Sequence, residues 1–122
     1  MFFFLLFIAF AAANNEGLVS LNAETFKAHK EMGKTMLVKF FAPWCGHCKR
    51  LQPTYEELAQ KMTENENVII AEVNCDEHRE LCQANGVRGY PTVLLFKGNV
   101  EEGKKFTGPR TIEELEKFVL EA

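Results

Sequence analysis

The sequence lacks the features with which proteins bind nucleic acids or cross membranes. Its 14 Lys and Arg residues are outnumbered by 17 Asp and Glu residues, which gives a formal net charge of -3. This balance leaves no basic face for phosphates, and the single Trp provides no platform for stacked bases. No apolar run reaches the roughly 20 residues that a membrane-spanning helix needs. We therefore expect no nucleic acid and, in the mature protein, no membrane among its partners.

The rest of the composition is typical of one globular domain. The chain has 122 residues, of which 47% are hydrophobic and 25% are charged. After Ala13 it contains no repeat, no linker and no low-complexity tract. These features predict one domain over residues 14–122, and we expect that domain to be a monomer.

The first 13 residues differ from everything that follows. Met1–Ala13 carries no charged side chain, is rich in Phe and Leu, and has the small residues Ala11 and Ala13 at its end. This pattern is typical of a secretory signal peptide and its cleavage site, so residues 1–13 are predicted to be removed. The alternative is an N-terminal strand or tag that packs on the domain.

Strand-like and helix-like patterns alternate along the remaining chain. Near-continuous apolar runs are typical of strands covered on both faces, whereas apolar residues at three- and four-residue steps indicate helices. Strands are expected at residues 18–21, 36–42, 68–73 and 92–96 and near Phe106, and helices at residues 22–33, 45–62, 76–85 and 111–119. This order predicts an α/β fold with a central mixed β-sheet flanked by helices on both faces.

Two cysteines, Cys45 and Cys48, begin the helix that follows the buried strand 36–42. Free backbone N–H groups and the helix dipole favour negative charge there, so a thiolate is expected at Cys45. Cys48 lies one turn later on the inward face and should be more buried and less ionised. We predict that Cys45 attacks and Cys48 resolves the mixed disulfide. Gly46 leaves room for a substrate sulfur, and a positive His47 would make the disulfide more oxidising.

This cysteine pair has two other possible uses, a structural disulfide and half of a zinc site. Structural zinc needs four ligands in two suitably spaced pairs. The remaining cysteines, Cys75 and Cys82, are separated by six residues instead of two. We therefore expect redox chemistry at Cys45 and Cys48, with no metal and no cofactor.

Two segments resemble those of protein disulfide isomerases. They are residues 41–49 (FAPWCGHCK) and residues 87–92 (VRGYPT), which look like the active-site and cis-proline motifs of catalytic domains in that family. The resemblance covers nearly all of the chain after Ala13 and is greatest to the three-domain endothelial member. It implies a thioredoxin fold and a thiol–disulfide oxidoreductase.

The resemblance also implies roles for individual residues. Pro91 would be the cis proline that lies against the disulfide, although an X-Pro bond taken alone is better expected to be trans. The backbone of Tyr90 would pair with an extended substrate. Arg88 would swing towards Cys48 and favour its thiolate. Trp44 would contact substrate beside the nucleophile, and half-buried packing is the alternative role for it.

Lys39 departs from the family pattern. Most members of the family that this chain resembles have a buried Glu or Asp six residues before the first cysteine. That carboxylate accepts the proton of the resolving thiol. A lysine could stand on this proton path only if burial made it neutral. Otherwise Lys39 would extend its charge to the surface or merely line the sheet edge.

Cys75 and Cys82 form the second pair, at the end of a strand and on the next helix. The related domains carry a disulfide there, and a bridge would close a short loop in an oxidising compartment. This makes a structural disulfide the favoured interpretation, with two buried free thiols as the alternative.

These features together predict an enzyme of the protein disulfide isomerase type. It would form and rearrange disulfide bonds in secretory-pathway proteins, in the endoplasmic reticulum lumen or after secretion. Its partners would be unfolded or nascent protein thiols and disulfides, with glutathione or an oxidase for reoxidation. A reductase like thioredoxin would favour Gly-Pro between the cysteines. A non-catalytic module that holds unfolded chains around Trp44 and Tyr90 is the third interpretation.

Overall fold

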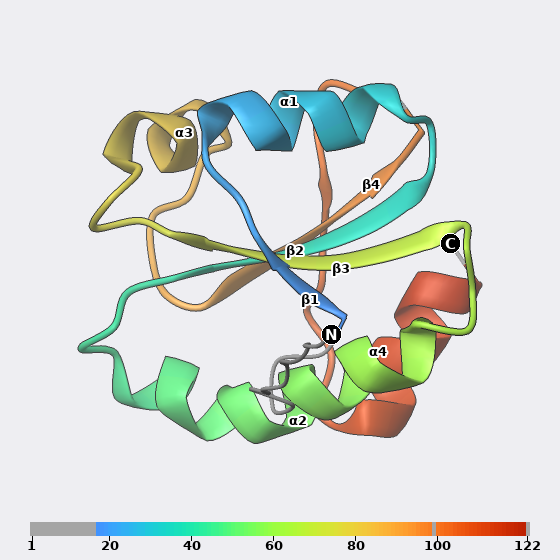
Figure 1. The fold of residues 1–122 in the computed structure, drawn as a ribbon. Helices are drawn as coiled ribbons and strands as arrows, with labels where there is room; N and C mark the ends of the chain where they lie inside the picture. The colour runs from blue at the N-terminus through green and yellow to red at the C-terminus, as the bar shows by residue number, and fades with distance from the viewer. Residues whose placement is uncertain (1–16, 99, 122) are drawn as a thin grey trace, which may run out of the picture.

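A five-stranded mixed sheet crosses the middle of the protein, with helices on both of its faces (Figure 1). The computed structural model describes residues 17–98 and 100–121, so the predicted signal peptide lies outside the described residues. The strands are β1 (Leu18–Ser20), β2 (Thr35–Phe41), β3 (Val68–Asn74), β4 (Thr92–Lys97) and β5 (Lys104–Lys105). The helices are α1 (Ala23–Glu31), α2 (Gly46–Met62), α3 (Arg79–Ala84) and α4 (Ile112–Leu120).

The strand β2 occupies the centre of the sheet, whose order is β1-β3-β2-β4-β5. It pairs parallel with β3 and antiparallel with β4. Because both faces of a central strand are covered, its five inner residues are all buried, as the apolar run predicts. Figure 1 shows α1 and α3 on one face of the sheet and α2 and α4 on the other.

Two hydrophobic cores form on the two faces, because alternate side chains of a strand point in opposite directions. On the α1 side, Phe26 packs edge-on against Phe96 of β4, with ring centroids 5.3 Å apart. On the α2 side, the apolar stripe predicted after Cys45 packs against the sheet and α4. Its buried residues are Leu51, Tyr55, Leu58, Ala59 and Met62. This stripe fixes which side of α2 faces inward.

The architecture confirms the predicted α/β fold with a mixed central sheet. The helix expected from residue 76 begins only at Arg79, because residues before it form a turn in which the Asp76 amide donates to Asn74 Oδ1 at 3.0 Å. The last strand ends one residue before Phe106. In the described ranges, no helix is both long and apolar enough to cross a membrane.

Candidate active site

Cys45 is the N-cap residue of α2, at the point where the chain leaves the carboxyl end of β2. Its backbone is extended, and its amide donates to the carbonyl of Ala42 at 3.1 Å. The Cys45 Sγ accepts a hydrogen bond from the Cys48 amide at 3.1 Å. One of the free N–H groups of the helix start is therefore directed at this sulfur, where it stabilises negative charge.

Both thiols are free and both are buried, with 7% of Cys45 and 3% of Cys48 exposed. Cys48 is the more buried of the two, in the order expected from its place on the inward face. Only a small part of Cys45 is therefore accessible to another sulfur atom.

The Cys48 thiol holds its proton strongly. Its pKa is raised from an ordinary 9.0 to about 11, mainly by burial and also by a hydrogen bond with the Cys45 side chain and by the Cys45 charge. The backbone of Ala42 and the charge of Lys39 act in the opposite direction. At neutral pH Cys48 is therefore a thiol, and its proton has to leave before it can act as a nucleophile.

The Tyr90–Pro91 segment lies against the cysteines. The peptide bond between the two residues is cis. The carbonyl oxygen of Tyr90 accepts a hydrogen bond from Cys45 Sγ at 3.6 Å. Tyr90 and the cysteines also belong to one apolar cluster with Ala42. The fold thus brings together the two sequence motifs, although Cys45 and Tyr90 are 45 positions apart in the chain.

Trp44 is the most exposed large hydrophobic side chain of the described residues, with 66% of its surface accessible. Its ring meets that of Tyr90 edge-on, with centroids 5.8 Å apart, and its Nε1 donates to Asp76 Oδ1 at 3.4 Å. This exposure argues against the half-buried packing role. Asp76 was not expected at the site, and no sequence signal links it to Trp44.

Lys39 is fully buried at the centre of the sheet, so neither the sheet-edge position nor the charge at the surface describes it. Its Nζ forms an ion pair with Glu72 Oε1 at 3.1 Å and donates a hydrogen bond to Gln52 Oε1 of α2. It also lies over the rings of Phe41 and Tyr55, 4.9 and 5.0 Å from their centroids. Burial of an ammonium is tolerated here because these groups replace its water.

Glu72 was missed by the sequence analysis. It lies in β3 directly opposite Lys39 in β2, as the register of the two strands places their Cα atoms together. The available signal was a single carboxylate inside the apolar run of residues 68–73, matched by a single lysine inside residues 36–42. Only the register of the sheet shows that Lys39 and Glu72 lie opposite each other.

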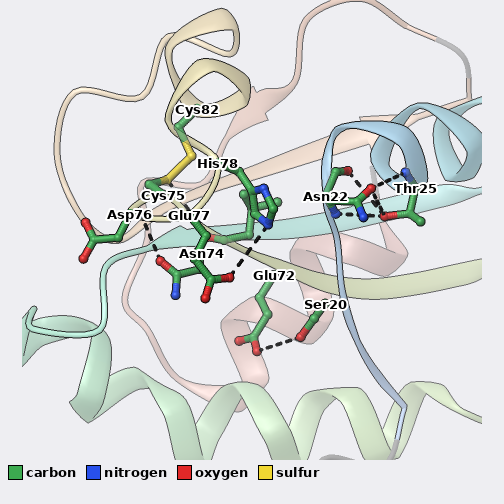
Figure 2. A network of polar contacts seen from close by, with 11 residues as sticks. Ser20, Asn22, Thr25, Glu72, Asn74, Cys75, Asp76, Glu77, His78 and Cys82 are labelled. Atoms are coloured by element: carbon green, nitrogen blue, oxygen red, sulfur yellow. Dashed lines mark hydrogen bonds and ion pairs between the residues drawn. A yellow bond between two sulfur atoms is a disulfide. The ribbon is translucent and has the colours of Figure 1, made fainter.

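Cys75 and Cys82 form a disulfide with an S–S distance of 2.03 Å and Cα atoms 5.8 Å apart (Figure 2). Both residues are buried in the core on the α1 side. The Cys75 amide donates to the carbonyl of Phe41 at 2.8 Å, and the Cys82 carbonyl accepts from the Val87 amide at 3.0 Å. The bridge therefore ties together the chain segments that lead to both active-site motifs.

A match to a family model decides what this architecture is. The model of the thioredoxin family matches residues 17–121. The chain belongs to the thioredoxin family. Several of the proteins that it is similar to are named protein disulfide isomerases. The first thioredoxin domain of mouse protein disulfide-isomerase A4 is 33% identical with a TM-score of 0.74, over 84% of this chain and 72% of that one.

Two curated relatives agree with this placement. A probable protein disulfide-isomerase A6 from Medicago sativa is 46% identical over 112 residues, which are 92% of this chain and 31% of the relative. A thioredoxin domain-containing protein 5 homolog from Drosophila melanogaster is 49% identical over 102 residues, which are 83% of this chain and 24% of the relative. The chain thus spans less than a third of the length of either relative. Its greatest likeness to the three-domain endothelial member stays a prediction.

In this thioredoxin-family domain, two further predicted site residues, His47 and Arg88, are exposed. The guanidinium of Arg50 donates to His47 Nδ1 at 2.8 Å, so in this arrangement the imidazole is an acceptor on that nitrogen and lies beside a positive charge. Arg88 is exposed, and among the described contacts none joins it to Cys48. Its role in resolution stays a prediction. Within the described residues, no group of three His, Cys, Asp or Glu side chains could hold a metal.

Proposed function

We propose that this domain is a thiol–disulfide oxidoreductase that forms and rearranges disulfide bonds in secretory-pathway proteins through its Cys-Gly-His-Cys pair. The observation that carries the proposal is the Cys45 Sγ at the N-cap of α2, with the Cys48 amide directed at it. Such a position lowers the free energy of a thiolate, which is the form that attacks disulfides.

The exchange proceeds in two displacements. The Cys45 thiolate attacks one sulfur of a substrate disulfide, which forms a mixed disulfide and releases the other substrate sulfur as a thiolate. Cys48 then loses its proton and attacks Cys45 Sγ, which breaks the mixed disulfide and frees the second substrate thiol. The substrate gains two electrons and the Cys45–Cys48 pair loses them. The reverse sequence inserts a disulfide into a reduced substrate.

The substrate would lie across Trp44 and Tyr90. Extended chain can pair with the backbone beside Pro91, while an apolar side chain rests on the exposed indole. Unfolded or nascent proteins present both features, and native proteins bury them. Reoxidation would come from glutathione or an oxidase. The predicted signal peptide supports the endoplasmic reticulum lumen or secretion as the location.

The equilibrium reduction potential of the Cys45–Cys48 pair against glutathione tests this function. A potential close to that of the glutathione buffer of the secretory pathway allows both formation and rearrangement of disulfides. A potential as low as that of thioredoxin would identify a reductase instead.

A binding module that only holds unfolded chains is the second candidate, and the exposed Trp44 beside Tyr90 favours it. The change Cys45→Ser separates the two. It should abolish the refolding of a scrambled disulfide protein if the domain is an enzyme. If refolding is still accelerated by the Cys45→Ser protein, the domain acts by binding.

A further inference from the structure

A small cavity borders both Cys48 and Glu72, the acid of the ion pair between the central strands. It has a volume of about 190 Å³, and Cys48, Gln52 and Glu72 are among the residues that line it. A water molecule occupies roughly 30 Å³ in the liquid, so this space is large enough for water to connect the thiol with the carboxylate. Among the described residues around this cavity, Glu72 is the only acid.

The carboxylate of Glu72 is placed to accept a proton. Its side chain is only 15% exposed, and apart from the ion pair with Lys39, its buried Oε1 has no hydrogen-bond partner. Its Oε2 accepts from Ser20 Oγ at 3.5 Å, and Figure 2 shows the side chain leaving β3 on the side of α2. A buried carboxylate oxygen whose one partner is an ammonium keeps a lone pair that can accept a hydrogen bond from water or bind a proton.

Glu72 also borders a second cavity, of about 260 Å³, on the way to the surface. Ser20 and His78 are among the other residues that line it. The same residue thus borders both the cavity at Cys48 and a cavity lined by residues of the polar network drawn in Figure 2, among them Ser20, Glu77 and His78. A proton that Glu72 accepts from the cavity at Cys48 can be released into the cavity lined by Ser20 and His78.

We propose that Glu72 is the proton acceptor for Cys48 when the mixed disulfide is resolved, and that Lys39 is the positioning residue that holds it there. The inference rests on the proposed function. The S–H bond of Cys48 breaks, its proton passes through water to the Glu72 carboxylate, and the thiolate forms a bond to Cys45 Sγ. The substrate sulfur leaves with the electron pair of the broken S–S bond and takes a proton from solvent.

The chemistry of the mixed disulfide favours this step. Two of the causes that raise the Cys48 pKa, the hydrogen bond with Cys45 and the Cys45 charge, disappear once Cys45 is bonded to substrate. The charge of Lys39, which lowers that pKa, stays. The proton of Cys48 is therefore released more easily during resolution than in the free reduced domain.

The test separates resolution from attack. Mixed disulfides are trapped by acid quench at successive times, first in the parent domain and then in Glu72→Gln. We expect escape from the mixed disulfide to slow by at least about tenfold, because a positioned general base is lost, while the rate of attack by Cys45 changes by less than about twofold. Glu72→Asp, which keeps a carboxylate, should restore part of the escape rate.

The matched control is Glu56→Gln. Glu56 is the other acid of this network, since its Oε2 accepts from Gln52 Nε2 at 2.9 Å, but it is absent from the residues around the Cys48 cavity. Its loss should leave escape at the parent rate. Equal slowing of escape in Glu56→Gln and Glu72→Gln would overturn the assignment to Glu72.

A second variant protects the test against unfolding. Glu72→Gln leaves the Lys39 ammonium buried without its counter-ion, which lowers the stability of the folded domain. The double variant Lys39→Gln/Glu72→Gln removes both charges and should fold, with escape as slow as in the single variant. If either folded variant resolves mixed disulfides at the parent rate, the inference is wrong. If the parent itself forms none, the proposed function fails instead.

Discussion

The indole of Trp44 donates a hydrogen bond to Asp76, the residue that directly follows Cys75 of the structural disulfide. The carboxylate lies 3.4 Å from Nε1, and the amide of Asp76 is held in turn by Asn74 Oδ1 at 3.0 Å. An exposed aromatic side chain has many rotamers available. This bond restricts Trp44 to the orientation in which it meets the ring of Tyr90.

Loss of the indole should weaken the binding of protein substrates. For Trp44→Ala we expect the KM for a peptide disulfide to rise about threefold to tenfold, because an aromatic contact is worth about 0.5–1.5 kcal/mol. Asp76→Ala keeps the indole ring but removes its hydrogen-bond partner, so it should raise the KM by a smaller factor. Steady-state kinetics with the peptide and with oxidised glutathione check this. An equal rise for both substrates would show that Trp44 acts on the cysteines and not on the substrate chain.

The two active-site thiols should differ strongly in reactivity. With the Cys48 pKa raised to about 11 by burial, only about 1 in 10,000 of its thiols is ionised at pH 7. Alkylation of the reduced domain followed by peptide mapping should modify Cys45 far faster. The rate at Cys48 should rise about tenfold per pH unit up to about pH 11. Equal rates at neutral pH would contradict the assigned roles.

The same pKa predicts how the stability of the reduced domain depends on pH. In the unfolded chain Cys48 loses its proton near pH 9.0, whereas in the folded domain it keeps it until about pH 11. Between these values the unfolded state binds fewer protons, so the free energy of unfolding falls as pH rises. Urea unfolding of the parent and of Cys48→Ser isolates this contribution, because Ser does not titrate. A pH-independent difference between the two proteins would show that Cys48 has no raised pKa.

Removal of the second disulfide should reduce stability. For the double variant Cys75→Ser/Cys82→Ser we expect the free energy of unfolding to fall by about 2–3 kcal/mol, because the short loop is no longer closed in the unfolded chain. Turnover at the Cys45–Cys48 pair should be nearly unchanged. Under mild reduction that opens the active-site bond, peptide mapping of the parent should still find Cys75 and Cys82 joined. Alkylation of both in the native oxidised protein would refute the bridge.

His47 should tune the potential of the pair. We expect His47→Pro to lower the reduction potential, because it removes an imidazole that can carry positive charge near the Cys45 thiolate. Position 47 is in the first turn of α2, where proline is tolerated. His47→Ala, which keeps the backbone N–H, is the matched control and should shift the potential in the same direction. An unchanged potential in both variants would mean that Arg50, already bonded to His47, dominates the local charge.

The sequence by itself determined the parts of this protein whose chemistry is local. The three-residue step from Cys45 to Cys48 places both sulfurs on one turn of a helix, and the apolar period after them decides that Cys48 faces inward. The unbroken apolar runs predict covered strands, and their alternation with helices gives the fold class that the structure confirms. Each of these signals lies within one element, so it can be identified without knowing where the others lie.

Tertiary structure alone decided the environment of Lys39. In the sequence, Lys39 is only a lysine that departs from a family pattern. Glu72 is a single acidic residue in another apolar run, 33 positions later. The parallel register of β2 and β3 places them opposite each other, and the inward face of α2 adds Gln52 and Cys48 to the same side of the sheet. A buried charge is stable only with partners that replace its water. Because Lys39 and its partners belong to three separate elements, β2, β3 and α2, the packing of these elements determines how the charge is held.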